Sequence, residues 1–306
     1  MFPPRYLFAS LALVLALGAM TGCAAEGSSG KPQVVASFYP LQYVAERIVG
    51  GHAEVSNLTK PGAEPHDLEL TPRQTATLTS ASVVFHEKGL QPAMDEAIAN
   101  DRPDHVVDAA EVVGLHHAED DQAHEDGADH DHQGADPHFW LDPTRLADVG
   151  DALAGRLGEL DPDGADTYRQ NAAALREDLD VLDREMTDGL SGCTVDVLVT
   201  SHDAFGYLAD RYGFEVVGIS GISPSAEPSA EQLARISRLV SERRVTTVYT
   251  ETLVDPAVAE TVASEAGVAT AGLDPLEGLT DESDGDDYLA VMRANLATLQ
   301  EGQSCS

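Results

Sequence analysis

Positive charge is scarce in this sequence: 18 lysine and arginine residues face 53 aspartate and glutamate residues, which gives a formal net charge of −35. Nucleic acid and anionic membrane surfaces repel such a protein, so we exclude both as partners. Cysteine is rare, with three residues in 306, and tryptophan occurs once. Hydrophobic residues still make up 42% of the chain, which is enough for real cores and argues against disorder.

The N-terminus has the features of a bacterial lipoprotein signal. The apolar run Leu7–Met20 has 14 residues, too few for a comfortable membrane span but suitable for a signal-peptide core. It leads into Met20-Thr21-Gly22-Cys23, which resembles a lipobox. We expect residues 1–22 to be the signal peptide, Cys23 to carry the lipid, and residues 23–32 to be a flexible tether. An ordinary secretory signal is the alternative, and both place the mature protein outside the cytoplasm, the lipobox anchoring it to the cell membrane.

The two remaining cysteines form an even pair in an oxidising compartment. If Cys23 carries lipid, Cys193 and Cys305 are left, and we predict that they are bridged. The alternative is two unpaired buried thiols.

Short β-rich runs alternate with helical stretches from Gln33 onward, which predicts an α/β fold with largely parallel sheets. One apolar stripe, at spacings of three and four residues, predicts a long helix over residues 162–188. Such a helix can span two α/β halves. We therefore expect an N-terminal lobe over 33–142, a helical segment over 143–190 and a C-terminal lobe over 191–306.

A histidine-rich insert interrupts the first lobe at residues 115–136. It contains almost nothing apolar, so it cannot pack a core and is predicted to be a mobile loop. Imidazole suits zinc, copper and nickel, and the irregular spacing predicts weak, multiple binding. The histidines concerned are His116, His117, His124, His130 and His132.

Three other histidines lie next to predicted strands or helices. His66 and His202 follow predicted strands, His138 precedes a helix, and Asp274 follows the last strand. Ligands of open α/β sheets bind beyond the carboxyl ends of the strands. Each histidine alone is more often structural, but three in corresponding places favour a binding site.

The surrounding motifs make the pattern specific: PGAEPHDLELTP, DPHFWLDP, TSHDAFGYLADRYG and AGLDPLEGL. In order and spacing they resemble the metal-binding signatures of the zinc/manganese solute-binding proteins of ABC transporters, across essentially the whole mature chain. The resemblance implies two α/β lobes joined by one long rigid helix, with the metal in the cleft between them. It also implies His66, His138, His202 and Asp274 as ligands, although a water could replace Asp274.

Two further residues are predicted to support these ligands. Glu251 ends a strand and could orient His202, and Trp140 is expected to pack beside His138. Manganese-type relatives typically have Glu where this chain has His202, and three imidazoles with one carboxylate favour zinc. Relatives of the zinc type can carry an acidic residue directly before the first histidine; here Pro65 stands there, so Glu64 is not assigned.

These observations predict a receptor that captures zinc and delivers it to an ABC-transporter permease, acts as a monomer and is not an enzyme. The alternatives are a manganese- or iron-type receptor, an adhesin of the same fold, and a secreted zinc hydrolase. The hydrolase needs an open coordination position and a base beside the bound water. The sequence contains no HExxH or GxSxG motif.

Overall fold

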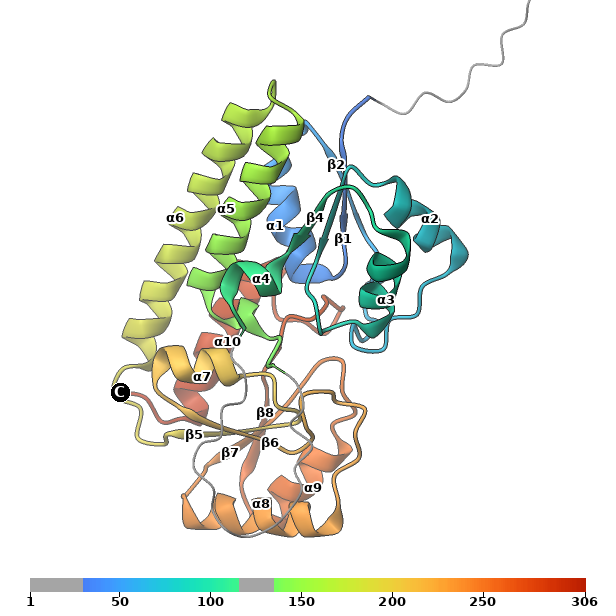
Figure 1. Ribbon diagram of the computed structural model, residues 1–306. Helices are drawn as coiled ribbons and strands as arrows, with labels where there is room; N and C mark the ends of the chain where they lie inside the picture. The colour runs from blue at the N-terminus through green and yellow to red at the C-terminus, as the bar shows by residue number, and fades with distance from the viewer. Residues whose placement is uncertain (1–29, 116–134) are drawn as a thin grey trace, which may run out of the picture. The chain divides into compact units, whose positions relative to one another are not determined.

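Two four-stranded sheets form the framework of the computed structural model, which describes residues 30–115 and 135–306 (Figure 1). All pairs within them are parallel, in the orders β2-β1-β3-β4 and β6-β5-β7-β8. The first sheet contains β1 (Gln33–Ala36), β2 (Glu54–Asn57), β3 (Val83–His86) and β4 (Val106–Asp108). The second contains β5 (Val197–Thr200), β6 (Glu215–Gly218), β7 (Thr247–Thr250) and β8 (Ala269–Gly272). The predicted α/β class with two parallel-sheet lobes is confirmed.

Helices alternate with these strands in both halves. The first half contains α1 (Tyr39–Val49), α2 (Pro72–Ser80), α3 (Pro92–Asp101) and α4 (Ala109–Val113). A single 3-10 turn, η1 (Phe139–Leu141), then leads to α5 (Pro143–Leu160) and α6 (Ala165–Leu190). The second half contains α7 (Gly206–Tyr212), α8 (Ala230–Glu242), α9 (Ala257–Ala266) and α10 (Tyr288–Gly302).

Local sequence explains where several helices begin. Thr71 caps α2 by accepting a hydrogen bond from the Gln74 backbone N–H, and Pro72 occupies the first helical position. Asp142 caps α5 in the same way, accepting from Thr144 N, again before a proline. These caps satisfy backbone N–H groups that a helix start leaves without partners.

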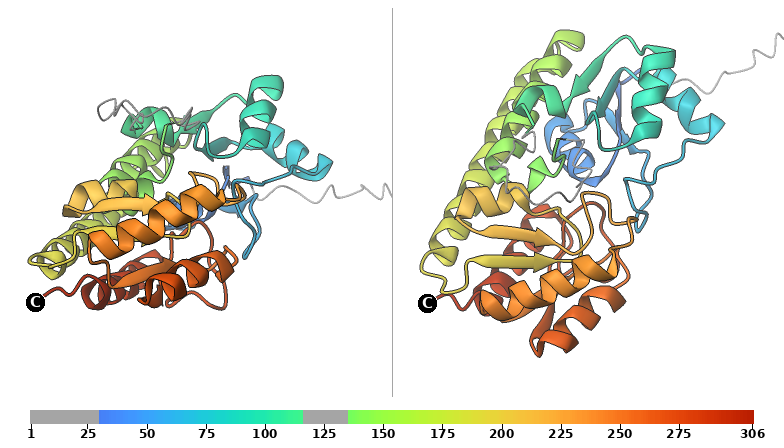
Figure 2. Two further views of the ribbon diagram at one scale, coloured as in Figure 1. Left: turned by 90° about the horizontal axis from the view of Figure 1, so that it is seen from below. Right: turned by 60° about the horizontal axis from the view of Figure 1, so that its bottom comes forward.

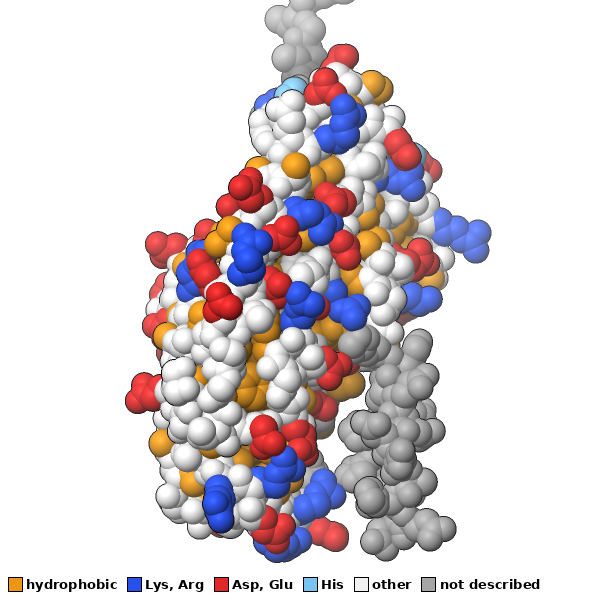
Figure 3. Space-filling view, turned by 90° about the vertical axis from the view of Figure 1, so that its left-hand side faces the viewer, with side chains coloured by type: hydrophobic (Ala, Val, Ile, Leu, Met, Phe, Trp, Pro, Cys, Tyr) orange, Lys and Arg blue, Asp and Glu red, His pale blue; other side chains and the backbone are white. Residues whose placement is uncertain are grey.

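The 26-residue helix α6 is about 39 Å long at 1.5 Å per residue. Its predicted apolar stripe is fully buried, at Tyr168, Ala172, Leu175, Leu179, Leu182 and Met186. It packs against α1 and α5 of the first half and against α7 and α10 of the second (Figure 1, Figure 2). The resemblance implied one long helix joining the lobes, and α6 is that helix. Its outer face, shared with α5, mixes carboxylates with arginines (Figure 3), among them Arg176 with Asp148 and Asp151.

One hydrophobic core runs through both halves. It includes Val34 and Phe38 near the first sheet, Leu179 of α6, and Leu198 and Tyr249 of the second sheet. Two smaller clusters cover other sheet faces, one beneath α8 and α9 and one beneath α2 and α3. The shared core ties the two sheets into the single unit Pro32–Ser306.

A disulfide joins Cys193 to Cys305, as predicted. It links the segment after α6 to the last residues of the chain, which follow α10.

Several predictions concern residues outside the described part of the chain. These are the signal peptide 1–22, lipidation of Cys23, most of the tether 23–32 and the five loop histidines, His116, His117, His124, His130 and His132. Among the described helices, none combines the length and hydropathy needed to cross a membrane.

Candidate metal centre

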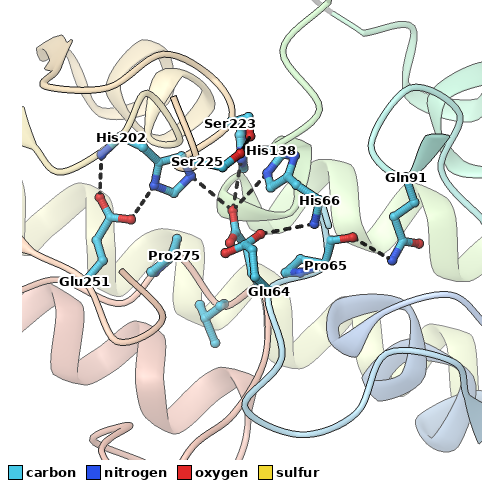
Figure 4. Close-up of polar contacts among 12 residues, drawn as sticks. Glu64, Pro65, His66, Gln91, His138, His202, Ser223, Ser225, Glu251 and Pro275 are labelled. Atoms are coloured by element: carbon cyan, nitrogen blue, oxygen red, sulfur yellow. Dashed lines mark hydrogen bonds and ion pairs between the residues drawn. The ribbon is translucent and has the colours of Figure 1, made fainter. Parts of the chain in front are cut away.

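Three imidazoles converge on one carboxylate between the two sheets (Figure 4). Nε2 of His138 and Nε2 of His202 each lie 3.1 Å from Glu277 Oε1, and His66 Nε2 lies 3.4 Å from the same oxygen. One atom of each side chain falls within 4.8 Å of the other three. This is the one group of three or more potential metal ligands at such spacing in residues 30–115 and 135–306.

The segments that carry these four side chains come from both halves of the fold. His66 lies between β2 and α2, and His138 directly precedes η1; His202 follows β5, and Glu277 lies between β8 and α10. The strands concerned are parallel, so their carboxyl ends meet at one edge of each sheet. The fold therefore brings together the three histidines that the sequence analysis singled out.

Two carboxylates contact the Nδ1 atoms of His138 and His202, on the side of each ring opposite to Glu277. Asp136 Oδ1 lies 2.8 Å from His138 Nδ1, and the Glu251 carboxylate pairs with His202 Nδ1. Glu251 also accepts a hydrogen bond from the His202 backbone N–H at 3.0 Å. This places a proton on Nδ1 and leaves Nε2 for an ion, the arrangement that orients metal-binding histidines. Glu251 lies where it was expected, whereas Asp136 was not singled out.

Burial and charge set the protonation of the centre. His138 and His202 are fully buried and Glu277 is 1% exposed. Burial opposes the charge on His138, but hydrogen bonds to Asp136 and Glu277 outweigh it and raise its pKa to about 9. Burial also opposes charge on His202, and Glu251 reverses the effect, so its pKa is raised well above the ordinary value. In the metal-free protein, the additional protons on these two rings supply the positive charge that a metal ion would otherwise bring.

The pKa values of the other two members of the cluster are lowered. Burial lowers the pKa of His66, which favours the neutral ring. Burial would raise the pKa of Glu277, but the hydrogen bonds from His138 and His202 and the nearby ring of His66 outweigh it and hold the pKa well below the usual range. Glu277 is therefore an anion facing three imidazole nitrogens, and one of its oxygens, Oε2, is buried without a hydrogen-bond partner.

The structure corrects the expectation for Asp274. Its carboxylate accepts hydrogen bonds from Leu276 N at 2.8 Å and Ser283 Oγ at 2.7 Å. Its backbone N–H and C=O bond to the side chain of Asn295 at 2.9 and 2.7 Å. Asp274 therefore shapes the turn after β8, and that turn presents Glu277 as the fourth member of the cluster.

Glu64, which was left unassigned, lies beside the centre. Its Oε1 accepts a hydrogen bond from His66 N at 3.1 Å, and its Oε2 is buried without a partner. Burial and the charge of Glu277 raise its pKa to about 8. Figure 4 shows this carboxylate close to His66.

Trp140 contacts both halves at the centre. Its ring centroid lies 5.2 Å from that of His138, so it packs beside this histidine as expected. Its Nε1–H donates to the carbonyl of Pro275 at 2.7 Å, and Tyr288 Oη donates to the carbonyl of Trp140 at 2.6 Å. The segment of His138 is thereby bound to the segment of Glu277.

The curated proteins similar to this chain are named as zinc-binding or zinc-uptake proteins. The chain is 34% identical over 281 residues to the zinc-binding lipoprotein AdcA of Streptococcus pneumoniae serotype 4, with 90% of this chain and 56% of that protein covered. It is 32% identical over 304 residues to the high-affinity zinc uptake system protein ZnuA of Bacillus subtilis, with 94% and 93% covered. The chain thus spans about half the length of the AdcA relatives that it matches.

Solved structures agree in fold. The Zn(II)-bound ZnuA-like domain of S. pneumoniae AdcA superimposes with a TM-score of 0.72 at 33% identity, covering 90% of this chain and 99% of that one. The laminin binding protein of Streptococcus agalactiae, described as having adhesin and metal transporting activity, gives a TM-score of 0.78 at 30% identity, covering 89% and 99%.

A family model provides the last comparison. The model of zinc-uptake complex component A, periplasmic, matches residues 34–302, which include both sheets except Gln33, all of α6 and all four members of the cluster. The chain belongs to this family of zinc-uptake components.

Proposed function

We propose that this chain is an extracytoplasmic receptor that binds one zinc ion through His66, His138, His202 and Glu277 and delivers it to the permease of an ABC transporter. The observation that carries the proposal is the convergence of three Nε2 atoms and one carboxylate oxygen within 4.8 Å. Three neutral imidazoles and one carboxylate form a four-coordinate donor set that suits zinc.

The position of the site supports transport rather than chemistry. Zinc hydrolases need an open coordination position and a base beside the bound water. Here four protein ligands already match the number that zinc takes in closed tetrahedral sites. They come from segments of both halves, so a change at the interface between the halves alters the site and can release the ion.

The relatives support the compartment and the ligand. AdcA is named a zinc-binding lipoprotein, and the AdcA ZnuA-like domain was solved with Zn(II) bound. We propose that Cys23 anchors the mature chain to the membrane by a lipid, that the chain acts as a monomer, and that it catalyses no reaction. The bound zinc is cargo for the permease.

Metal selectivity tests the proposal directly. The metal-stripped chain is equilibrated with a buffer containing equal zinc, manganese and iron(II), and its metal content is measured after removal of weakly bound ions. We expect about one zinc per chain and loss of that zinc in His202→Ala. Retention of manganese in preference to zinc, or an unchanged zinc content in the variant, would contradict the assignment.

Delivery needs a second measurement, in cells. Zinc accumulation in zinc-limited medium is compared between cells carrying the natural chain, His138→Ala and Cys23→Ser. We expect uptake to fail with His138→Ala and to weaken with Cys23→Ser, which keeps the metal site. Normal uptake with His138→Ala would contradict a receptor role.

A further inference from the structure

A second group of metal-ligating side chains lies on the first half alone. His86 ends β3 and Asp108 ends β4, and the two residues are register partners in the parallel sheet. Paired residues on neighbouring strands direct their side chains to the same face. With Asp95 of α3 and Glu111 of α4 they line a cavity of about 320 Å³.

Two atoms in this cavity have unused hydrogen-bonding capacity. The side chain of His86 is 5% exposed, and neither its Nδ1 nor Asp95 Oδ1 has a hydrogen-bond partner among the described residues. Buried polar atoms without partners are uncommon and need an explanation. Nδ1 and Oδ1 lie 3.9 Å apart, slightly more than the roughly 3.4 Å that separates two ligand atoms bound to one tetrahedral zinc.

The neighbouring groups favour a cation. The carboxylates of Asp95, Asp108 and Glu111 face a single ammonium group, that of Lys88, around the cavity. Backbone N–H groups already hold one oxygen of each aspartate: Asp95 Oδ2 accepts from Gly89 N, and Asp108 Oδ1 from Lys88 N and Ala110 N. These bonds fix both carboxylates in place beside the imidazole. Burial lowers the pKa of His86, so its ring is neutral and its nitrogens can accept a metal.

We propose that His86 and Asp95 form a second divalent-cation site, which takes zinc or a similar imidazole-binding ion more weakly than the centre of His66, His138, His202 and Glu277. Two protein ligands supply the direct bonds, water fills the remaining positions, and Asp108 and Glu111 add negative charge. The site goes beyond the receptor function, because it needs no residue of the second half. An ion held here raises the zinc concentration on the first half of the molecule.

Stoichiometry of zinc binding tests this site in the full mature chain. Metal-stripped protein is titrated with Zn²⁺ in competition with a chromogenic chelator, and the equivalents bound are counted for the parent, His86→Ala, Asp95→Asn and Glu96→Gln. Glu96 is exposed on the same helix α3, so its variant removes one charge without touching the cavity. Equivalents contributed by the histidine-rich segment are common to all four proteins.

We expect His86→Ala and Asp95→Asn each to bind one equivalent fewer than the parent, Glu96→Gln to match the parent, and the tightest equivalent to keep its affinity within about twofold in all four. Equal numbers of equivalents in all four proteins would overturn the second site. If the parent itself bound no tight equivalent, the receptor function would be overturned instead. The two failures can therefore be told apart.

Discussion

Each imidazole of the metal centre uses Nε2 toward Glu277, and a carboxylate fixes the opposite nitrogen of two of the rings. Asp136 holds His138, and Glu251 holds His202. The carboxylates keep the rings in place when no ion is present and make them better donors when one is. At the scale of single residues, affinity therefore depends on side chains that never touch the ion.

Glu277 and Asp274 have different roles despite their closeness in sequence. We expect Glu277→Gln to weaken zinc binding by about a hundredfold or more, because it removes a ligand. Replacing a residue that only supports a ligand typically lowers metal affinity about 10–100-fold. Asp274→Asn is expected to lower the free energy of unfolding by about 1–3 kcal/mol through its buried hydrogen bonds and to weaken zinc binding less. Chelator competition and denaturant unfolding of both variants measure this. If Asp274→Asn weakened zinc binding as strongly as Glu277→Gln, Asp274 would again have to be counted as a ligand.

The Trp140–Pro275 hydrogen bond gives a second prediction. Trp140→Phe keeps an aromatic ring but leaves the buried carbonyl of Pro275 without its donor, at a cost of about 1–3 kcal/mol. Because this bond joins the segments of His138 and Glu277, we expect part of the cost to appear as weaker zinc binding. Tyr249→Phe is the matched control, since it removes the buried hydrogen bond to Gln303, and neither residue belongs to the cluster. Titration calorimetry should show weaker zinc binding in Trp140→Phe alone.

Protons and zinc compete for the same nitrogens, which predicts a pH dependence. The raised pKa values of His138 and His202 mean that both rings are protonated at neutral pH in the metal-free protein, whereas His66 is neutral. Zinc must displace about two protons, so affinity rises with pH through neutrality and continues to rise at least to about pH 9, the pKa of His138. Calorimetry at one pH in buffers of different ionisation enthalpy counts the protons released. A count of zero near pH 7 would contradict the predicted protonation.

Not every functional residue could be predicted from the sequence. The three histidines stood in distinctive motifs beside predicted strands, which was enough to single them out. Glu277 also lies in one of these motifs, AGLDPLEGL, but a strand-end argument favours Asp274 over it. The backbone turn at Leu276, with φ 59°, is what presents Glu277 to the centre. Asp136 opens the motif DPHFWLDP but is also the last of the many carboxylates of the histidine-rich segment, and nothing in the sequence shows that it bonds to His138.

At the scale of helices and strands, local chemistry made boundaries predictable. Helix α5 begins at Pro143, where the helical segment was expected to start, because Asp142 and Pro143 mark its start. Helix α6 begins at Ala165 rather than at residue 162, because Asp161–Gly164 forms a turn in which Asp161 also accepts a hydrogen bond from Tyr168. The five-residue helix α4 was missed, since so short a segment has no periodicity to detect.

The disulfide acts at this scale, because it ties the end of α6 to the end of α10. Cys193 and Cys305 are 112 residues apart, and closing a loop of that length is worth up to about 4.7 kcal/mol on the chain-entropy model. We expect Cys193→Ser with Cys305→Ser to lower Tm by several degrees. Zinc affinity should stay the same, since neither cysteine belongs to the metal cluster. Scanning calorimetry and zinc titration of the double variant check both statements; an unchanged Tm would show that the bond adds nothing to stability.

At the scale of the whole molecule, one continuous core explains how two sheets hold a single site. Residues of both sheets and of α6 share this core, and Trp140 and Tyr288 add hydrogen bonds between the halves beside the metal. The net charge of −35 favours cations near the surface and disfavours anionic partners. The sequence predicted the two halves and the long helix, but not the shared core, because helical and strand periodicities show which face is buried and not against what.

The complete ligand set within the described residues leads to a prediction for the histidine-rich insert. His66, His138, His202 and Glu277 need no further protein ligand to reach four-coordination. The insert is polar, and holding its histidines in one geometry would cost about 1–2 kcal/mol per ordered residue. We therefore expect deletion of residues 118–134 to leave the tight zinc equivalent unchanged and to remove most of the weaker ones. Calorimetric titration of the deletion variant decides this, and a hundredfold loss of the tight equivalent would mean that the insert supplies a ligand.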